Sequence, residues 1–433
     1  MIDTKDKNCK IAVIGVGPVG LATALGFAVK GYKNINCYDI NSGRIQQLKN
    51  NKSPFFEKDL QNYLLRFAHH LAFSDDAEII KNSDVYVVCV GTPSDENGQF
   101  NTSMFWQAVA NVKEASTTPF ILIIKSTVPI GTNVKVKKYF DKNKVHGDVV
   151  SNPEFLAQGS LIRDTLFASR IVIGSSNKQL YRTIANLYKP YQGKFIFTTP
   201  ESAELAKLAS NCYLAMRISY INDIANVCEL VGANIKDVQL AMGTDPRIGL
   251  NYLSPGAGYG GSCFPKDTNG LWSQLNYEYK YDIKLVKATI EINEKQSLMM
   301  CKKILNDFGT LTNLEITLIG LSFKPNTDDV RHSIAVKSIE FLLTKGAKIS
   351  VWDPYAMNNA KLIFGDSIHY CKNIQEAIKK CKIILILTEL EELRCLDLRE
   401  LLNKNVYDGR NCFVSKKLPF KYSYIGGSNY KNQ

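Results

Sequence analysis

A glycine-rich segment near the amino terminus constrains the fold of this chain more than any other sequence feature. An apolar run over 10–14, typical of a buried parallel strand, leads into Gly15-Val16-Gly17-Pro18-Val19-Gly20, and an apolar helix pattern follows until Gly31. A second strand is predicted over 34–40 and carries Asp39. The glycines allow a tight turn and a close approach of a pyrophosphate to the helix amino terminus, where backbone N–H groups favour an anion. The spacing predicts a dinucleotide-binding fold.

Asp39 also indicates which dinucleotide is bound. Its carboxylate would accept hydrogen bonds from the adenosine ribose of NAD, whereas the 2′-phosphate of NADP would meet its negative charge. We therefore expect NAD as the cofactor. The alternative is a glycine-rich turn in some other α/β protein, which the neighbouring strand, helix and acidic residue together disfavour.

Further strands of the same sheet are predicted over 85–90, 120–124, 148–151 and 171–173, separated by segments of helix length. This alternation predicts a doubly wound parallel sheet, in which ligands bind beyond the carboxyl ends of the strands. The turns at those ends are Gly91-Thr92-Pro93, Lys125-Ser126-Thr127-Val128-Pro129 and Asn152-Pro153-Glu154-Phe155-Leu156. We expect them to line the cofactor and substrate site.

A long helical pattern begins near residue 201 and continues to Gly232, with Lys207 and Asn211 four residues apart on one face. A glycine-rich loop over 243–267 follows, and then more helix to about residue 306. The last third repeats the design of the first, because 315–320, 348–353 and 383–388 parallel 11–15, 36–39 and 85–90. We predict two Rossmann-type domains joined by a long central helix and a helical connector, with boundaries at 1–200, 201–306 and 307–433.

The first turn of the predicted second domain, Leu321-Ser322-Phe323-Lys324-Pro325, lacks the glycine fingerprint. It therefore predicts a ligand other than a dinucleotide. A lysine and an aromatic ring at such a turn would suit a phosphate and a base.

The composition excludes several classes of protein. Hydrophobic residues at 45% and charged residues at 22% of 433 residues are those of a globular chain, not of a disordered or collagen-like one. The first residues lack the apolar core of a signal peptide, and no apolar run is long enough to span a membrane, so we expect a cytoplasmic protein with no membrane partner. A general lysine bias explains the net charge of +12, so nucleic-acid binding is not expected.

One cysteine differs from the others. The eleven cysteines form no C-x-x-C pair and their number is odd, which argues against a disulfide framework or a structural zinc site, and no metal is expected. Cys263, however, stands in Gly258-Tyr259-Gly260-Gly261-Ser262-Cys263-Phe264-Pro265-Lys266-Asp267, between closely spaced glycines and a predicted helix start. A thiol near a helix amino terminus and a lysine should have a lowered pKa and act as a nucleophile. The alternative is a buried structural cysteine in a tight loop.

Several motifs in order along nearly the whole chain are similar to those of the UDP-glucose/GDP-mannose dehydrogenase family. They are the amino-terminal fingerprint, Lys125-Ser-Thr-Val-Pro129, Asn152-Pro-Glu-Phe-Leu156, the helix segment 204–211, Asp245-Pro-Arg-Ile-Gly249, the Cys263 decapeptide, the segment 323–331 and Asp408-Gly-Arg410. The resemblance implies an NAD-linked oxidation of a hexose C6 hydroxyl, in two successive steps, to the acid of a nucleotide sugar.

The resemblance also implies roles for six catalytic residues. Lys207, Asn211, Asp267 and Thr127 belong to the first oxidation, in which Lys207 would either act as the base or, as we favour, stabilise the alkoxide while Asp267 and water relay the proton. Cys263 would then capture the aldehyde as a thiohemiacetal that becomes a thioester. Glu154 would activate water for hydrolysis of the thioester.

Binding residues are implied in the same way. For the cofactor they are Gly15, Val16, Gly17, Pro18, Val19, Gly20, Asp39, Arg44, Thr92, Thr127, Gln158, Lys266 and Arg331. For the nucleotide sugar they are Glu154, Phe155, Leu156, Gln158, Lys207, Asn211, Arg247, Tyr252, Leu253, Ser254, Pro255, Gly256, Gly260, Phe323, Lys324 and Arg410. Arg247 is implied to reach a neighbouring subunit's site, so at least a homodimer is expected.

The sequence departs from the family pattern at four positions. Pro18 stands where tyrosine is common, Gln158 where a second glutamate is frequent, His332 where a glutamate is expected and Leu390 where a tryptophan is expected. Gln158 bears on the chemistry, because any assistance to Glu154 in the hydrolysis is then in doubt.

Three classes of function follow. The leading hypothesis is a dehydrogenase that takes UDP-glucose as its substrate, with UDP-galactose, a UDP-N-acetylhexosamine or GDP-mannose as alternatives within the family. The second is a hydroxyacid dehydrogenase that carries out a single oxidation and would tolerate loss of Cys263. The third is a nucleotide-sensing or nucleic-acid-binding protein without catalysis, which would leave Cys263, Lys207 and Asn211 unexplained.

Overall fold

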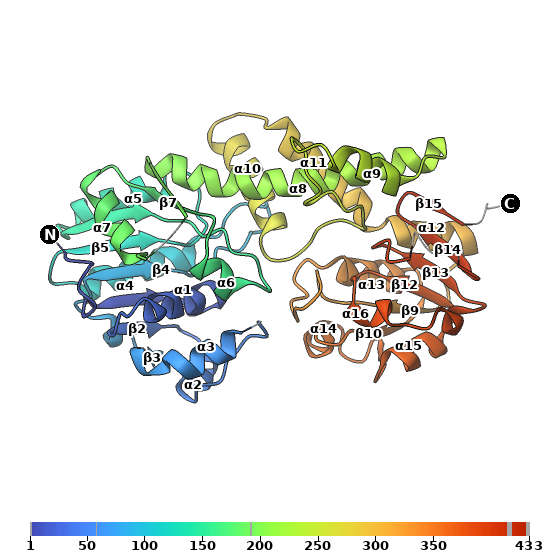
Figure 1. The fold of residues 1–433 in the computed structure, drawn as a ribbon, viewed down its shortest axis with the longest axis horizontal. Coiled ribbons are helices and arrows are strands. Elements are labelled where there is room, and N and C mark those ends of the chain that lie inside the picture. Colours follow the sequence, from blue (N-terminus) through green and yellow to red (C-terminus); the bar gives the residue numbers. More distant parts are fainter. Residues whose placement is uncertain (1, 58, 191–192, 414–417, 430–433) are drawn as a thin grey trace. The chain divides into compact units, whose positions relative to one another are not determined.

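The chain forms two compact units, Met1–Ser210 and Asn211–Gln433. The computed structural model describes residues 2–57, 59–190, 193–413 and 418–429. Figure 1 shows that each unit contains one central sheet with helices packed on it. The predicted division into three domains stays a prediction.

Unit 1 is built on an eight-stranded sheet of order β3-β2-β1-β4-β5-β6-β7-β8. Its strands are β1 (Ile11–Ile14), β2 (Ile35–Tyr38), β3 (Leu71–Ser74), β4 (Val85–Val88), β5 (Phe120–Ile124), β6 (Gly147–Ser151), β7 (Arg170–Gly174) and β8 (Lys194–Thr198). The first six strands are parallel and have the order of a dinucleotide-binding sheet, as the sequence predicts.

The predicted strand over 171–173 exists as β7, but the expectation that it is parallel to the others is wrong. β7 runs antiparallel to β6, and β8 is parallel to β7. A fully buried strand is an uninterrupted apolar run in either direction, so its pattern does not reveal its polarity.

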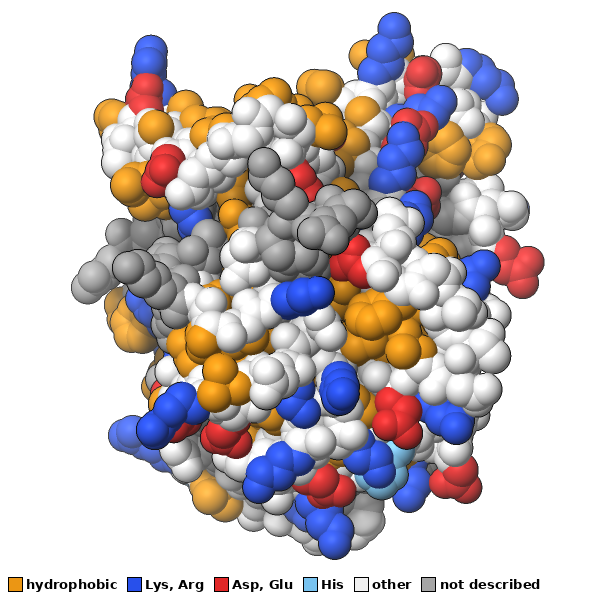
Figure 2. Space-filling view, turned by 90° about the vertical axis from the view of Figure 1, so that its right-hand side faces the viewer, with side chains coloured by type: hydrophobic (Ala, Val, Ile, Leu, Met, Phe, Trp, Pro, Cys, Tyr) orange, Lys and Arg blue, Asp and Glu red, His pale blue; other side chains and the backbone are white. Residues whose placement is uncertain are grey.

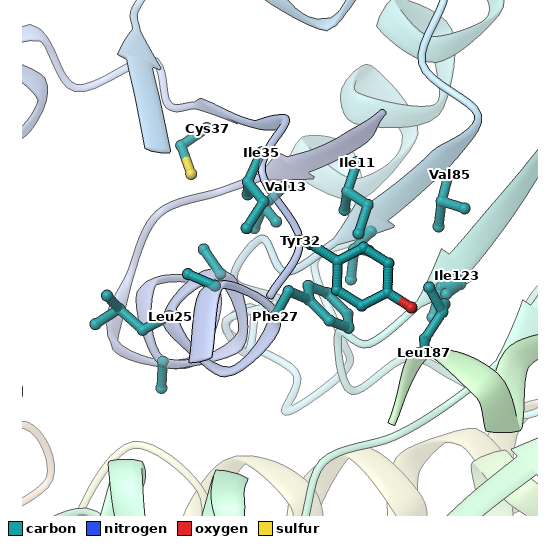
Figure 3. Packing of buried hydrophobic residues seen from close by; sticks show 14 of the residues in the cluster. Ile11, Val13, Leu25, Phe27, Tyr32, Ile35, Cys37, Val85, Ile123 and Leu187 are labelled. Carbon is teal, nitrogen blue, oxygen red and sulfur yellow. The ribbon is translucent and has the colours of Figure 1, made fainter. Parts of the chain in front are cut away.

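Helices cover both faces of the unit 1 sheet. They are α1 (Pro18–Val29), α2 (Ser42–Lys49), α3 (Leu60–Phe67), α4 (Ser103–Ala115), α5 (Thr132–Lys142), α6 (Leu161–Leu166) and α7 (Gln179–Leu187). Ile11 and Val13 of β1 face the cluster formed with α1, α3, α6 and α7, part of which is drawn in Figure 3. Ala12 and Ile14 face the cluster formed with α4 and α5. Burial on both faces explains why these strands are apolar throughout.

The turn between β1 and α1 has the geometry that its glycines predict. Gly15 has a φ of +86°, a conformation that residues with a Cβ rarely adopt. A Cβ on Gly20 would lie 1.9 Å from the carbonyl oxygen of Gly15, so only glycine lets the helix start this close to the strand. Pro18 occupies the first position of α1, where it needs no hydrogen-bond partner for its nitrogen.

The long helix predicted from 201 to Gly232 is α8 (Pro200–Val231), and Gly232 follows it with a φ of +74°. The first turns of α8 belong to unit 1. There the buried carboxylate of Glu204 accepts the N–H of Gly131 at 2.6 Å, the N–H of Asn133 at 2.9 Å and the hydroxyl of Ser151 at 3.2 Å. Glu204 thus caps the amino terminus of α5 and joins α8 to the sheet.

Unit 2 contains a seven-stranded sheet of order β11-β10-β9-β12-β13-β14-β15. Its strands are β9 (Glu315–Ile319), β10 (Lys348–Trp352), β11 (His369–Tyr370), β12 (Ile383–Ile386), β13 (Asn405–Asp408), β14 (Lys421–Tyr424) and β15 (Gly427–Ser428). All the pairs are parallel except β14 with β15. The three strands predicted from the internal repeat are confirmed as β9, β10 and β12.

Beyond α8, the residues described in unit 2 form four helices that precede its sheet in the chain and four that alternate with its strands. They are α9 (Ile235–Gly243), α10 (Phe264–Glu278), α11 (Lys284–Ser297), α12 (Met299–Phe308), α13 (Ile334–Thr344), α14 (Met357–Phe364), α15 (Ile374–Lys380) and α16 (Glu391–Arg394). The helical segment expected to end near 306 ends at Phe308. In the described part of the chain, no helix combines the length and the apolar character that a membrane crossing needs.

We expect Glu204→Ala to lower the free energy of unfolding by about 2–3 kcal/mol, because the buried N–H groups of Gly131 and Asn133 would lose a charged acceptor. Urea denaturation at pH 8.5 measures this change, because burial raises the pKa of Glu204 to about 7 and the carboxyl is fully ionised only above that pH. Glu201→Ala is the matched control, since Glu201 lies in the same turn of α8 but is exposed, and it should cost under about 1 kcal/mol. Equal losses in both variants would contradict the capping role of Glu204.

Candidate functional site

The cofactor turn of unit 1 is held by Asp39, which directly follows β2 and is buried. Its Oδ2 accepts the N–H of Val16 at 2.7 Å and lies 2.7 Å from the guanidinium of Arg44, while its Oδ1 accepts the N–H of Asn41 at 2.9 Å. Asp39 therefore has a structural task that the sequence did not reveal, because it fixes the backbone inside the fingerprint. The predicted contact of Asp39 with ribose stays a prediction.

Two expected threonines lie at the ends of β4 and β5. The hydroxyl of Thr92 donates to the carbonyl of Thr127 at 2.5 Å, and the hydroxyl of Ser126 donates to the carbonyl of Val90 at 2.7 Å. These bonds join the two turns at the carboxyl edge of the sheet. Thr127 lines a small cavity there together with Lys207 and Glu204.

The structure brings Glu154 and Lys207 together inside unit 1. The Nζ of Lys207 lies 3.1 Å from Oε1 of Glu154, and the two side chains are only 4% and 9% exposed. Oε2 of Glu154 accepts the N–H of Leu156 at 2.5 Å. Burial acts to raise the pKa of Glu154, but the charge of Lys207, the Leu156 N–H and the charge of Lys125 outweigh it and lower that pKa. Glu154 is thus an ionised carboxylate beside a buried ammonium.

The turn that carries Glu154 borders a cavity of about 400 Å³. Phe155 and Leu156 line it, together with residues of α1, α6 and β7, and the guanidinium of Arg170 lies 3.8 Å from the centre of the Phe155 ring. Gln158 follows in the same turn and is partly buried. Arg170 is a residue that sequence reasoning missed, because an arginine at the start of a strand carries no motif of its own.

A second group of expected residues lies in unit 2. Asp267 is 1% exposed, its Oδ2 accepts the side-chain amide of Asn211 at 2.5 Å, and its Oδ1 lies 2.5 Å from Nζ of Lys266. Asp267 is in the first turn of α10, and Cys263 is the residue immediately before that helix. The helix start predicted after Cys263 is confirmed.

Cys263 is exposed, whereas burial raises the pKa of most of the other thiols, for example that of Cys212 to about 12. An exposed thiol at a helix amino terminus is suited to nucleophilic attack. The lowered pKa that the sequence predicts for Cys263 stays a prediction. Cys395 is also exposed, so exposure alone does not distinguish Cys263.

The glycines before Cys263 serve the packing of the loop itself. A Cβ on Gly260 would lie 2.3 Å from the carbonyl oxygen of His332, and one on Gly261 would lie 2.7 Å from the Phe323 ring. Gly261 also donates its N–H to the carbonyl of Arg331 at 3.1 Å. The loop therefore packs directly on the turn that follows β9, and the proposed closeness of Gly260 to a hexose stays a prediction.

The expected nucleotide residues of unit 2 lie around two turns. Nζ of Lys324 lies 5.5 Å from the centre of the Phe323 ring in the turn after β9, and Arg331 pairs with Asp329 at 2.7 Å. Arg410 is largely buried and donates to the carbonyls of Leu387 at 2.7 Å and Gly258 at 3.1 Å.

The loop Tyr252-Leu253-Ser254-Pro255-Gly256 ends against Arg410, since a Cβ on Gly256 would lie 3.0 Å from the Arg410 guanidinium. Tyr252 is exposed and has a φ of +61°. Arg247 is exposed as well and pairs with Asp245 at 2.6 Å. Among the described contacts of Arg247, its guanidinium is held by this ion pair with Asp245.

Three buried polar residues that sequence reasoning missed position this loop. Asn222 of α8 accepts the N–H of Gly256 at 2.8 Å, Gln296 of α11 donates to the Gly256 carbonyl at 2.8 Å, and Asn293 accepts the N–H of Tyr259 at 2.8 Å. The sequence does contain a signal for them, because asparagine and glutamine on the apolar face of a predicted helix need hydrogen-bond partners when they are buried.

The described residues contain one group that could hold a metal ion, and it lies apart from the expected site residues of unit 2. His369, Cys371 and Glu376 offer ligand atoms that lie within 4.8 Å of one another at the edge strand β11 and the start of α15. Glu376 has another task there, since its carboxylate accepts the N–H of Lys372 at 2.8 Å next to the helix start. Capping of α15 therefore explains the place of Glu376.

Comparison with known proteins identifies relatives along nearly the whole chain. Residues 9–192 match the model described as "UDP-glucose/GDP-mannose dehydrogenase family, NAD binding domain", residues 201–295 match its central domain and residues 317–415 its UDP binding domain. The chain is 37% identical over 414 residues to UDP-glucose 6-dehydrogenase YwqF of Bacillus subtilis, covering 93% of this chain and 94% of that protein. It is 36% identical to UDP-glucose 6-dehydrogenase of Rickettsia typhi, covering 96% and 99%.

A solved structure shares the fold over the same extent. A UDP-glucose dehydrogenase from the hyperthermophilic archaeon Pyrobaculum islandicum superimposes with a TM-score of 0.91 and 32% identity, covering 97% of this chain and 98% of that one. The UDP-D-ManNAc dehydrogenase of Pyrococcus horikoshii superimposes with a TM-score of 0.87 and 25% identity.

We expect Asp39→Asn to shift the cofactor preference. The amide keeps an acceptor for the Val16 N–H but removes the charge that would repel a 2′-phosphate, so affinity for NADP relative to NAD should rise about tenfold. Isothermal titration of each dinucleotide gives the two dissociation constants. Asp141→Asn is the control, because Asp141 is an exposed residue of α5 paired only with Lys137 in the salt bridges described. An unchanged ratio of the two constants in Asp39→Asn would refute the assignment.

Proposed function

Because the chain belongs to the UDP-glucose/GDP-mannose dehydrogenase family, we propose that it oxidises the C6 hydroxyl of UDP-glucose to a carboxylate, at the expense of two NAD and one water. The observation that carries the choice of UDP-glucose is the similarity, at 36–37% identity over more than nine-tenths of the chain, to proteins named for that activity. NAD, when bound, accepts a hydride from C6 in each oxidation.

The NAD-binding residues of unit 1 fit such a cofactor. Gly15 and Gly20 let α1 start close to β1, and a Cβ on Gly17 would meet no atom of the described residues within 4 Å, its chain neighbours aside, which leaves space for a pyrophosphate at the start of α1. Asp39 is fixed at the end of β2 by the Val16 N–H and by Arg44, in the place expected for a ribose acceptor.

The first oxidation requires that the C6 hydroxyl lose a proton while hydride leaves. We assign the proton relay to Asp267 and a water molecule. Lys207 is held as an ammonium by its pairing with the buried Glu154, so it suits the stabilisation of a negative oxygen better than proton abstraction. The product of this step is the aldehyde.

The second oxidation proceeds through Cys263. Its thiolate adds to the aldehyde carbon, and the oxyanion that forms is stabilised by N–H donors of Lys207 and Asn211. Loss of the second hydride gives a thioester. Glu154 then takes a proton from water as the water attacks the thioester carbonyl, and the Cys263 thiolate leaves with release of the carboxylate.

A homodimer is part of the proposal, and the exposed face of α8 supports it. Tyr213, Tyr220 and Val227 follow one another at intervals of seven residues on α8 and are 54%, 50% and 48% exposed. Such a stripe on a long helix is suited to burial against a second copy of the same helix.

The proposed location is the cytoplasm, where the cysteines stay reduced. The face drawn in Figure 2 carries Lys and Arg interspersed with Asp and Glu, which agrees with a general lysine bias.

The decisive assay compares UDP-glucose, UDP-galactose, UDP-N-acetylglucosamine and GDP-mannose at saturating NAD. We expect two NADH per UDP-glucose consumed and a kcat/KM for UDP-glucose at least about tenfold above the others. A higher kcat/KM for another sugar would transfer the assignment to that sugar, and one NADH per substrate would indicate a simple dehydrogenase.

Cys263→Ala should lose detectable steady-state turnover, whereas Cys395→Ala, which changes the other exposed cysteine, should keep it.

We expect Tyr220→Asp to shift the protein from dimer to monomer, because it places a charge in the centre of the stripe that the dimer would bury. Sedimentation velocity at micromolar concentration measures the change. Leu362→Asp is the matched control, since Leu362 is an 86% exposed leucine of α14 outside the stripe. A wild-type protein that sediments as a monomer would exclude the dimer.

A further inference from the structure

Lys125 is a buried lysine in a turn that is expected to line the cofactor and substrate site, but the proposed function gives it no role. It directly follows β5 and its residue is 8% exposed. Its Nζ lies 3.1 Å from Oδ1 of Asn152, 3.5 Å from the carbonyl oxygen of Asn152 and 3.5 Å from the hydroxyl of Tyr188. Among the described residues, these hydrogen-bond partners are all neutral. A buried ammonium paired only with neutral oxygens is costly, so its charge requires an explanation.

The hydrogen bonds of Lys125 end on the turn that carries Glu154. Asn152 is the first residue of that turn, and both the nitrogen and the oxygen of its side-chain amide take part in hydrogen bonds. Its amide donates to the carbonyl of Val172 at 2.7 Å, and its Oδ1 accepts from both Lys125 and the hydroxyl of Tyr188. Since Glu154 follows two residues later, Lys125 helps to set where its carboxylate lies.

Lys125 also acts on Glu154 through its charge. Two ammonium groups, those of Lys207 and Lys125, lower the pKa of the Glu154 carboxyl, and Lys207 has the larger effect. The other charged or titratable groups around this carboxyl and its cavity are Lys30, Cys89, Arg163, Asp164, Arg170 and Tyr188. On the Lys207 side the second carboxyl is Glu204, which is bound to N–H groups of α5 and whose pKa burial raises to about 7. A change of rate near pH 7 therefore belongs to Glu204, and the limb that reports Glu154 is the one at lower pH.

The two lysines have different positions in the proposed reaction, on which this inference rests. Lys207 stabilises the oxyanion of the thiohemiacetal and of the later hydrolysis, so the charge of Lys207 is then offset by a new negative oxygen. Glu154 must remain a carboxylate at that moment if it is to take the proton of water. Lys125 does not contact substrate in the proposed reaction, and its charge is therefore not offset.

We propose that Lys125 is a positioning residue for the hydrolytic step, which holds the Glu154 turn through Asn152 and keeps Glu154 ionised while Lys207 is engaged by the oxyanion. Water attack and proton transfer to Glu154 remain as described above. Lys125 neither gains nor loses a proton in the reaction.

The test follows the hydrolysis alone. The UDP-sugar C6 aldehyde and NAD are mixed with excess enzyme, and the acyl group on Cys263 is followed by mass spectrometry in acid-quenched samples between pH 3 and pH 8, because the pKa of Glu154 is lowered from its ordinary value of 4.5. Its disappearance gives the hydrolysis rate at each pH. In Lys125→Met the loss of a positive charge should raise the pKa of Glu154. Because the base must be ionised, the acid limb of the pH–rate profile, where the hydrolysis rate falls as the pH is lowered, should move to higher pH by about one unit.

Two further variants separate charge from structure. Lys125→Arg keeps the positive charge next to Glu154, so its acid limb should lie within about 0.3 pH unit of that of the wild type. Tyr188→Phe removes a hydrogen bond of the same network without changing the charge, and the limb should not move. Lys125→Gln replaces Lys125→Met if thermal melting shows that the latter does not fold.

A lower rate at every pH in Lys125→Met with no movement of the limb would overturn the proposal and leave Lys125 as a structural residue. The same conclusion holds if Tyr188→Phe moves the limb equally, or if no variant has a limb in this pH range. The failure of the proposed function looks different, because the wild-type enzyme would then form no acyl group on Cys263 or no NADH from UDP-glucose.

Discussion

A carboxylate at the end of the second strand holds the first turn in both units of this chain. In unit 1, Asp39 follows β2 and accepts the N–H of Val16 in the turn after β1. In unit 2, Asp353 follows β10 and accepts the N–H groups of Leu321 and Ser322 in the turn after β9, at 2.8 and 3.1 Å. The geometry of each turn depends on the hydrogen bonds that this carboxylate accepts. The start of each ligand site depends on them as well.

The two turns are also alike in their glycines, yet they differ in what their carboxylates can still do. Gly15 and Gly320 have φ values of +86° and +90° at equivalent points. Asp353, however, also accepts the hydroxyl of Ser322 and the N–H groups of Tyr355 and Ala356, so its oxygens are occupied by the protein itself. The difference agrees with a dinucleotide in unit 1 and another kind of nucleotide ligand in unit 2.

Much of this architecture could be predicted from the sequence, because it depends on local rules. Gly15 and Gly20 mark the turn, Gly232 marks the end of α8, and the apolar runs mark the strands. The direction of β7 could not be predicted, since an apolar run has no polarity. The bonds made by Glu204 and Lys125 could not be predicted either, because they join residues that are far apart in the chain and lie outside any spacing rule.

The candidate site was predictable in its residue types but not in its electrostatics. Sequence motifs indicated Glu154, Lys207 and Asp267, but the structure shows that each carboxylate is buried and paired with a lysine, Glu154 with Lys207 and Asp267 with Lys266. For Glu154 the charge of Lys207 lowers the pKa and favours the ionised carboxylate. That pairing depends on side-chain directions in the folded chain.

Glu204 has a consequence for any attempt to express the units as separate fragments. The sequence suggests a cut near residue 200, ahead of α8, whereas the compact units divide between Ser210 and Asn211, within that helix. A fragment ending at 200 would leave α5 without the carboxylate that caps it, and the complementary fragment would carry Glu204 with none of its three donors. A cut after Ser210 would keep Glu204 with its donors, but it would divide α8 itself.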